Sequence, residues 1–254
     1  MVRILGHRGA RGLWPENSIF GFRKAIDLGV DIIEFDVHLS ADGVPVVIHD
    51  GTLQRTTTGQ GLVSEKTVAE LAHCRLQGRE EEGVTTLDTV LAALAGTSVT
   101  LGVEIKTGPD AAPYPDFEAN VLGVLQRHGV LDRTMMLSFV PDCLERVRAV
   151  VPDLEVMACV WRPQVEILGG LEKAIARWNR IDGVILAIQE ELLTRNEDLC
   201  RRLIPPERLA VGIHNDPERM EHWLARPIRH ISTDRPDLAL DIRRRLAGTR
   251  PPVT

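Results

Sequence analysis

Residues 32–50 read IIEFDVHLSADGVPVVIHD, and this stretch decides how the rest of the chain is interpreted. Apolar residues alternate over the first eight positions with three polar ones, which predicts a strand carrying them on one face: Glu34, Asp36 and His38. Asp-Gly at 42–43 lies between two apolar alternations, the strongest short-range signal of a hairpin. A two-residue turn there places Asp36 opposite His49, which favours a metal site with a proton-transfer group beside it. The alternative is an ordinary solvated face of an antiparallel sheet.

The composition is that of an ordinary globular protein. The chain has 254 residues, 44% hydrophobic and 26% charged, and its 30 basic and 36 acidic residues give a net charge of −6. That balance offers no basic surface for a nucleic acid, so we expect no nucleic-acid partner. The four cysteines form no C-x-x-C pair, which is typical of free thiols in a reducing compartment. No apolar run could span a bilayer and no signal peptide is apparent, so we expect a cytoplasmic protein without a stable membrane anchor.

Outward from the hairpin, apolar runs that precede helical patterns occur eight times, centred near residues 4, 34, 102, 136, 157, 185, 211 and 230. The helical patterns include 165–179 and 190–203, each read as one helix. Eight βα units in a chain of this length predict an α/β fold, the TIM (β/α)8 barrel. We expect one domain over 1–254, with the hairpin as an extension of the second strand and 51–86 as a short insertion. The alternative fold is a doubly wound open sheet. Its nucleotide-binding form has a G-x-G-x-x-G motif after the first strand, and HRGARG does not match that motif.

Charged residues and histidines stand at the ends of the first three predicted strands and on the returning hairpin strand: His7, Arg8, Glu34, Asp36, Glu104, Lys106 and His49. In a barrel these strand ends converge. The three carboxylates make a hard-oxygen site that suits Mg²⁺ or Ca²⁺ better than zinc. The two cations could hold a phosphate beside the metal. The two histidines could take and give a proton in a phosphodiester displacement.

Each of these residues has a plainer explanation when taken singly. A carboxylate at a strand end is more often a helix cap or an ion-pair partner, and a lone histidine is more often structural. Four histidines lie on helices or away from the strand ends and are read as structural: His73, His128, His222 and His230. His38 shares the face of Asp36 and is left open between substrate contact and a structural role. The whole set at three strand ends is hard to explain as stability alone.

Six segments together resemble the glycerophosphodiester phosphodiesterase family in order and spacing: HRGARGLWPENS, EFDVHLSADGVPVVIHD, TTLDTVL, EIK, LSF and STDRPD. The resemblance covers the chain from His7 to Asp237. It implies a TIM barrel that hydrolyses glycerophosphodiesters to sn-glycerol 3-phosphate and an alcohol with a divalent cation, Mg²⁺ or Ca²⁺. The small insertion resembles that of the compact cytoplasmic members. The implied partner is a small-molecule substrate, and the oligomeric state stays open.

The resemblance also implies roles by motif position. His7 and His49 would be the general acid and base, with the assignment between them left open. The metal ligands would be Glu34, Asp36 and Glu104, and the phosphate contacts would be Arg8 and Lys106.

The chain departs from the family pattern in one strand, which reads LAVGIHND over 209–216. Members usually carry an aromatic residue, typically tryptophan, where Gly212 stands, and its ring would pack on the glycerol moiety. We expect a pocket to open there, so that Gly212→Trp would change the substrate profile. Phe139, Trp161 and Trp14 could supply a replacement wall.

Two other functions stay open beside the small-molecule phosphodiesterase. The first is a lysophospholipase D-like enzyme that uses the same residues on a lipid. The second is a phosphate-ester binding protein with an inactive site. An inactive site predicts the loss of a catalytic histidine or a metal carboxylate, and none is missing here.

Overall fold

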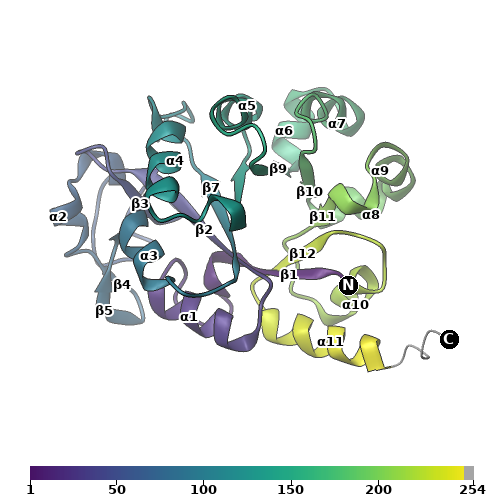
Figure 1. The fold of residues 1–254 in the computed structure, drawn as a ribbon, viewed down its shortest axis with the longest axis horizontal. Helices are drawn as coiled ribbons and strands as arrows, with labels where there is room; N and C mark the ends of the chain where they lie inside the picture. Colours follow the sequence, from purple (N-terminus) through teal and green to yellow (C-terminus); the bar gives the residue numbers. More distant parts are fainter. Residues whose placement is uncertain (249–254) are drawn as a thin grey trace.

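A closed barrel of eight parallel strands forms the centre of the structure (Figure 1). The computed structural model describes residues 1–248. Around the barrel the strands are β1 (Arg3–Gly6), β2 (Ile32–Leu39), β7 (Thr100–Ile105), β8 (Thr134–Ser138), β9 (Glu155–Val160), β10 (Ile185–Ile188), β11 (Leu209–Val211) and β12 (His230–Thr233). Strand β1 pairs in parallel with both β2 and β12, which closes the barrel. The TIM-barrel prediction is therefore confirmed, with a strand at each of the eight predicted positions.

Helices cover the outside of the barrel. They are α1 (Ile19–Leu28), α3 (Leu87–Ala93), α4 (Phe117–Arg127), α5 (Pro141–Val150), α6 (Arg162–Ile167), α7 (Leu171–Trp178), α8 (Glu190–Arg195), α9 (Glu197–Leu203), α10 (Pro217–Leu224) and α11 (Pro236–Gly248). The two single helices predicted over 165–179 and 190–203 are wrong, because each is a pair. Gly169 and Gly170 both have positive φ and separate α6 from α7, and Asn196 interrupts the helical backbone between α8 and α9.

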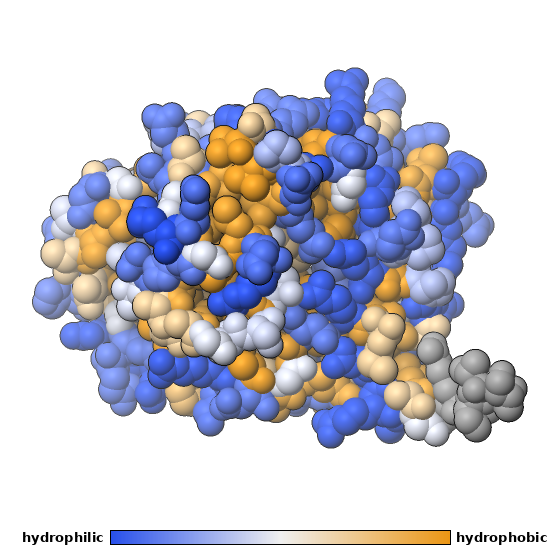
Figure 2. All heavy atoms as spheres, viewed as in Figure 1, coloured by the Kyte–Doolittle hydropathy of each residue, from blue (hydrophilic) through white to orange (hydrophobic). Residues whose placement is uncertain are grey.

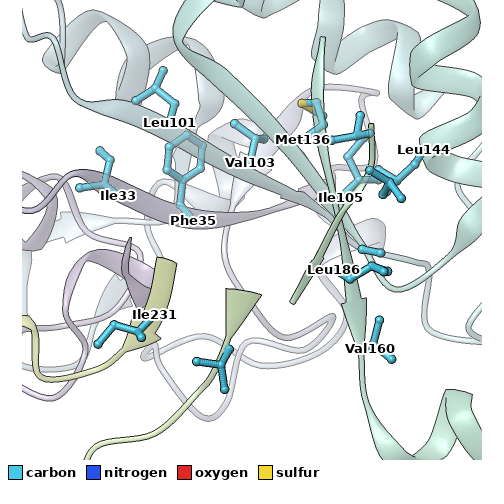
Figure 3. Close-up of a cluster of buried hydrophobic side chains, with 14 of the residues drawn as sticks. Ile33, Phe35, Leu101, Val103, Ile105, Met136, Leu144, Val160, Leu186 and Ile231 are labelled. Atoms are coloured by element: carbon cyan, nitrogen blue, oxygen red, sulfur yellow. The ribbon is translucent and has the colours of Figure 1, made fainter. Parts of the chain in front are cut away.

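Alternation along the strands divides their side chains between two apolar layers. One layer lies between the strands and the outer helices and includes Phe35, Val103 and Met136 (Figure 3). The other is a smaller cluster that fills the barrel: Leu5, Ile32, Met135, Leu137, Met157, Cys159, Ile185 and Ala210. Glu34 and Asp36 have the parity of Ile32, so they share its inward face nearer the carboxyl end of β2. The packed interior is thus a floor beneath the charged residues.

The hairpin register differs by one residue from the prediction. β2 pairs with β3 (Pro45–Val47) through Val37–Val47, so Ile48 and not His49 follows opposite Asp36. The loop has three residues, 41–43, and of these only Gly43 has positive φ, at 76°. A type I turn followed by a left-handed glycine is the common three-residue alternative to the two-residue turn. His49 reaches the mouth of the barrel because the chain leaves β3 after Val47 and bends at 49–50.

The segment after the hairpin is a small structured unit at one side of the barrel (Figure 1). It contains η2 (Val63–Glu65), α2 (Val68–Leu71), β4 (Arg75–Leu76), β5 (Arg79–Gly83) and β6 (Thr85–Thr86). The sequence predicts one short helix near 68–74, and the structure adds the β4–β5 hairpin to it. Apolar side chains of the insertion pack with two from the hairpin into a separate cluster: Val46, Ile48, Leu53, Val63, Leu71, Cys74, Leu76 and Val84. The insertion therefore has a small apolar core of its own, to which the hairpin contributes.

The surface in this view is mostly hydrophilic, with hydrophobic side chains in separate areas between polar ones (Figure 2). Large apolar side chains that are exposed lie on separate elements: Met1, Leu28, Val150 and Ile167. Scattered exposure of this kind is normal for a folded protein. Within 1–248, none of the helices is long and apolar enough to span a membrane.

Candidate active site

A cavity of about 340 Å³ opens at the carboxyl ends of the barrel strands. Eight of the nine predicted site residues line it: His7, Arg8, Glu34, His49, Glu104, Lys106, Phe139 and Trp161. The ninth, Asp36, is fully buried beside them and does not line the cavity. Residues separated by up to 154 positions in the chain thus surround one space because the strand ends meet there.

Three carboxylates form the acidic part of this cavity. One oxygen from each of Glu34, Asp36 and Glu104 lies within 4.8 Å of the others. Asp36 and Glu104 are neighbours because they are register partners on β2 and β7, and Glu34 pairs with Gly102.

Two cations partly neutralise the carboxylates. The Lys106 ammonium lies 2.9 Å from Asp36 Oδ1 and also contacts Glu104, and the Arg8 Nε lies 3.4 Å from Asp36 Oδ2. Burial works against ionised Asp36, but Lys106 and the other cations outweigh it and lower the Asp36 pKa. Burial, followed by the neighbouring carboxylates, raises the pKa of Glu34 well above its ordinary value. The nearby cations therefore do not fully neutralise an ionised Glu34.

The donor set fits a hard divalent cation. Glu34 Oε2 accepts a bond of 2.8 Å from the Arg8 backbone N–H, whereas Glu34 Oε1 is buried without a partner among the described residues. A buried carboxylate oxygen with no donor is costly, and a cation would satisfy it. Oxygen-only ligands at this spacing are those that Mg²⁺ and Ca²⁺ take. Glu34, Asp36 and Glu104 could therefore hold such an ion.

His7 lies just after β1 and is held by Asp234, which follows β12. Its Nδ1 lies 2.6 Å from Asp234 Oδ1, and a carboxylate partner requires that Nδ1 carry the proton. Burial lowers the His7 pKa, and the bond to Asp234 only partly opposes this. Asp234 is fixed in turn by Arg11 and Asn215 at 2.8 and 2.9 Å. His7 is thus a neutral imidazole with Nε2 left for the cavity.

His49 has a similar carboxylate partner in its neighbour. Its Nδ1 lies 2.6 Å from Asp50 Oδ1, which again leaves Nε2 unprotonated. Burial lowers the His49 pKa to about 4, although Asp36 acts in the opposite direction. Both mouth histidines are therefore oriented by a carboxylate at one nitrogen and can exchange a proton at the other.

The model of the glycerophosphoryl diester phosphodiesterase family matches residues 7–189, most of the chain, and this range includes both histidines and the three carboxylates. The chain belongs to the glycerophosphoryl diester phosphodiesterase family. A glycerophosphodiester phosphodiesterase of Caldanaerobacter subterraneus is 33% identical over 158 residues, which span 60% of this chain and 64% of the relative. The matched region is thus just under two thirds of that relative's length.

Solved structures extend the likeness over the whole fold. The glycerophosphodiester phosphodiesterase of Agrobacterium tumefaciens has a TM-score of 0.76 at 26% identity, covering 96% of this chain and 100% of that one. A phosphodiesterase of Oleispira antarctica, solved in complex with its product sn-glycerol-3-phosphate, has a TM-score of 0.80 at 23% identity, covering 94% and 96%. The second likeness shows the barrel fold alone.

Several side chains of this family member that support the site were missed by sequence reasoning. Asn17 stands just before the N-cap Ser18 of α1, where the sequence suggests only a place at the start of a helix, yet its side chain donates to Asp36 at 2.9 Å. Asp234 stands in a segment that carries the family resemblance, STDRPD, so that segment held the available signal. Nothing local in the sequence connects Asp234 to His7, because 227 positions separate them.

His38, whose role was left open, is a supporting residue. Its Nε2–H donates to the backbone oxygen of His49 at 3.0 Å, and its Nδ1 accepts from the Tyr114 hydroxyl at 2.9 Å. Both ring nitrogens are thus used within the protein. His38 therefore holds the backbone of His49 in place.

Part of the cavity lining is apolar. Phe139 and Trp161 meet edge to face with ring centroids 5.8 Å apart, and Leu137, Met157 and Ile213 also line the cavity. Trp14 lines a separate cavity of about 210 Å³. Of the three aromatic residues that the sequence offers for the lining, Phe139 and Trp161 therefore border the cavity and Trp14 does not.

The expectation that Gly212 opens a pocket for a ring is wrong. Gly212 borders the cavity with its backbone, but a Cβ added there would lie 2.6 Å from the Ser232 Cβ and 2.9 Å from its backbone oxygen. A side chain at this position would push into β12 and not into the cavity. A glycine is therefore required by the neighbouring strand.

We expect Gly212→Ala to lower the free energy of unfolding by about 1–3 kcal/mol, the usual cost of overpacking. Gly123→Ala is the control, because this glycine lies in α4 with only the end of the Arg127 side chain nearby, at 3.8 Å. It should be neutral or stabilising by up to about 1 kcal/mol. Urea unfolding measures both, and equal stabilities for Gly212→Ala and the unsubstituted protein would contradict the clash.

Proposed function

We propose that the protein hydrolyses glycerophosphodiesters to sn-glycerol 3-phosphate and an alcohol. The observation that carries the proposal is the arrangement of two carboxylate-held imidazoles, His7 and His49, around one cavity with the three-carboxylate cluster. General acid–base catalysis of phosphate-ester cleavage needs one group to take a proton and another to give one. The family membership and the likeness to the Caldanaerobacter subterraneus glycerophosphodiester phosphodiesterase support the same reaction class.

Two spaces beside the charged residues favour a diester over a monoester. A second hollow of about 620 Å³ shares His49, Glu104, Lys106 and Phe139 with the first cavity. His49, Glu104 and Lys106 therefore border both spaces. A phosphate bound at the charged groups would have room for one ester arm on each side.

The chain's own residues have distinct tasks in this proposal. Glu34, Asp36 and Glu104 would hold a divalent cation, which when bound supplies positive charge at the phosphate. Lys106 and Arg8 add fixed positive charge beside it. The free Nε2 atoms of His7 and His49 exchange protons with the entering and leaving oxygens.

A second candidate, a lysophospholipase D-like activity, is favoured by the apolar residues of the cavity lining. Leu137, Phe139, Met157, Trp161 and Ile213 line the cavity together with the charged residues. Apolar lining residues suit an apolar alcohol arm better than a charged one. The cavity's size, about 340 Å³, limits how much of a lipid it could enclose.

A substrate panel tests the proposal and separates the two candidates. We expect release of sn-glycerol 3-phosphate from glycerophosphocholine and glycerophosphoethanolamine, measured by a coupled dehydrogenase assay. A higher kcat/KM for a lysophospholipid than for either compound would favour the lipid-directed activity. Absence of hydrolysis across the panel, with Mg²⁺ or Ca²⁺ supplied, would overturn both.

A further inference from the structure

Arg55 lies in the insertion, yet its guanidinium bridges two loops at the barrel mouth. Its Nε and Nη2 donate to the two Asp50 oxygens at 2.5 and 3.0 Å. Its Nη1 and Nη2 donate to the two Glu16 oxygens, both at 2.8 Å. Two bidentate carboxylate contacts from one side chain fix both carboxylates in orientation as well as in charge.

Both carboxylates contact residues of the proposed site. Asp50 Oδ1 is the acceptor for Nδ1 of His49, and Glu16 Oε1 lies 3.0 Å from the Arg8 guanidinium. Arg55 is thus linked to His49 through Asp50 and to Arg8 through Glu16. Without it, the Asp50 side chain would keep His49 as its remaining partner within residues 1–248 and could rotate.

The backbone that carries Arg55 is fixed by the insertion. Leu53 is fully buried in the insertion's own apolar cluster, and its carbonyl accepts from the backbone and hydroxyl of buried Thr57 at 3.1 and 2.7 Å. Thr56 accepts from the Gln77 backbone at 2.9 Å. An exposed ion pair usually contributes little because both side chains are free to move. Here the Arg55 side chain is 45% exposed, but the backbone on either side of it is held.

We propose that Arg55 is a positioning residue: it holds Asp50 so that the His49 imidazole stays in one orientation with Nε2 available to the substrate. The proposal rests on the proposed phosphodiesterase function. It gives the insertion a task, since Leu53 of its apolar cluster anchors the backbone next to Arg55, and Arg55 links the insertion to His49 through Asp50. Arg55 itself touches no reacting atom.

The decisive experiment compares Arg55→Ala in two backgrounds. In the otherwise unchanged enzyme we expect kcat on a glycerophosphodiester to fall about 10–100-fold, as for other supporting residues, with a much smaller change in KM. In the His49→Ala background the same substitution should cost less than about twofold, because residues that act through one another are not additive. Arg55→Lys keeps the charge but cannot make the two bidentate contacts. Its kcat should therefore lie between those of Arg55→Ala and the unsubstituted enzyme.

Arg79→Ala is the matched control, since Arg79 belongs to the same insertion but pairs with Glu81 and Glu82 and packs over Phe20. Its kcat should stay near that of the unsubstituted enzyme. The inference is overturned if Arg55→Ala leaves kcat within about twofold, or costs the same factor in both backgrounds. Thermal melts of each variant separate a positioning effect from loss of the fold.

A readout without catalysis separates this inference from the proposed function. In protein labelled with ¹⁵N-histidine, the imidazole signal of His49 is identified by its loss in His49→Ala. Arg55→Ala should shift that signal, and Arg79→Ala should not. If no substrate is hydrolysed, a shifted signal still supports the tie between Arg55 and His49, and an unchanged signal overturns it.

Discussion

His7→Ala and His49→Ala should each lower kcat by about two to four orders of magnitude, the usual range for a general acid or base. Each substitution removes the one imidazole nitrogen that is free toward the cavity while leaving the three-carboxylate cluster in place. The double variant should lose less than the product of the two single losses, because the pair acts as a unit. Steady-state kinetics on glycerophosphocholine, with calorimetric Mg²⁺ or Ca²⁺ titration of each variant, measures this.

A substrate with a nitrophenol leaving group assigns the two roles. Nitrophenolate leaves with little need for a proton. This substrate should therefore restore kcat to the variant that lacks the general acid and not to the variant that lacks the general base. His73→Ala is the control, because His73 is exposed in the insertion and its ring bonds the Ala69 carbonyl, away from the proposed site. If His7→Ala or His49→Ala keeps nearly full activity on a substrate with a poor leaving group, the histidine replaced in that variant is structural.

Removal of divalent cations with EDTA should lower activity at least about 100-fold, and added Mg²⁺ or Ca²⁺ should restore it. The three carboxylates share one lysine and one arginine, so an ion would supply the missing positive charge. An ion at 100 times its Kd should stabilise the fold by about 2.7 kcal/mol, which raises Tm by roughly 5–10 °C for a chain of this size. Calorimetric melts with and without the metal measure the shift.

Glu34→Gln keeps the shape of the side chain and removes one charged ligand. It should abolish most of the metal-dependent rise in Tm and weaken binding in a direct titration. Glu81→Gln makes the same chemical change on an exposed carboxylate of the insertion and should leave the rise intact. Full activity after exhaustive chelation, or an unchanged metal response in Glu34→Gln, would remove the metal from the proposed reaction.

The positions of the eight strands followed from local pattern alone. Apolar runs separated by helical periodicity are set by neighbours within a few residues, so they can be read from sequence. The same alternation placed Glu34 and Asp36 on one face of β2, and the structure brings them together with Glu104. Convergence of the strand ends then followed from the barrel itself.

Local pattern was not sufficient where two conformations use the same residues. The hairpin sequence Ala-Asp-Gly is compatible with both a two-residue and a three-residue loop, and the structure has the longer one. The helical periods over 165–179 and 190–203 did not reveal the breaks at Gly169 and Asn196. Apolar periodicity continues across such a break, so it does not by itself show where the helical backbone is interrupted.

The sequence by itself determined the barrel, its charged mouth and the residue types available for acid–base and metal chemistry, because these depend on periodicity and on composition at strand ends. Tertiary structure alone decided which partner each side chain has. Asp234 reaches His7 across 227 positions, Arg55 reaches both Asp50 and Glu16, and Ser232 fills the space beside Gly212. Hydrogen bonds and close contacts act over a few ångströms, and the folded chain sets those distances independently of separation in sequence.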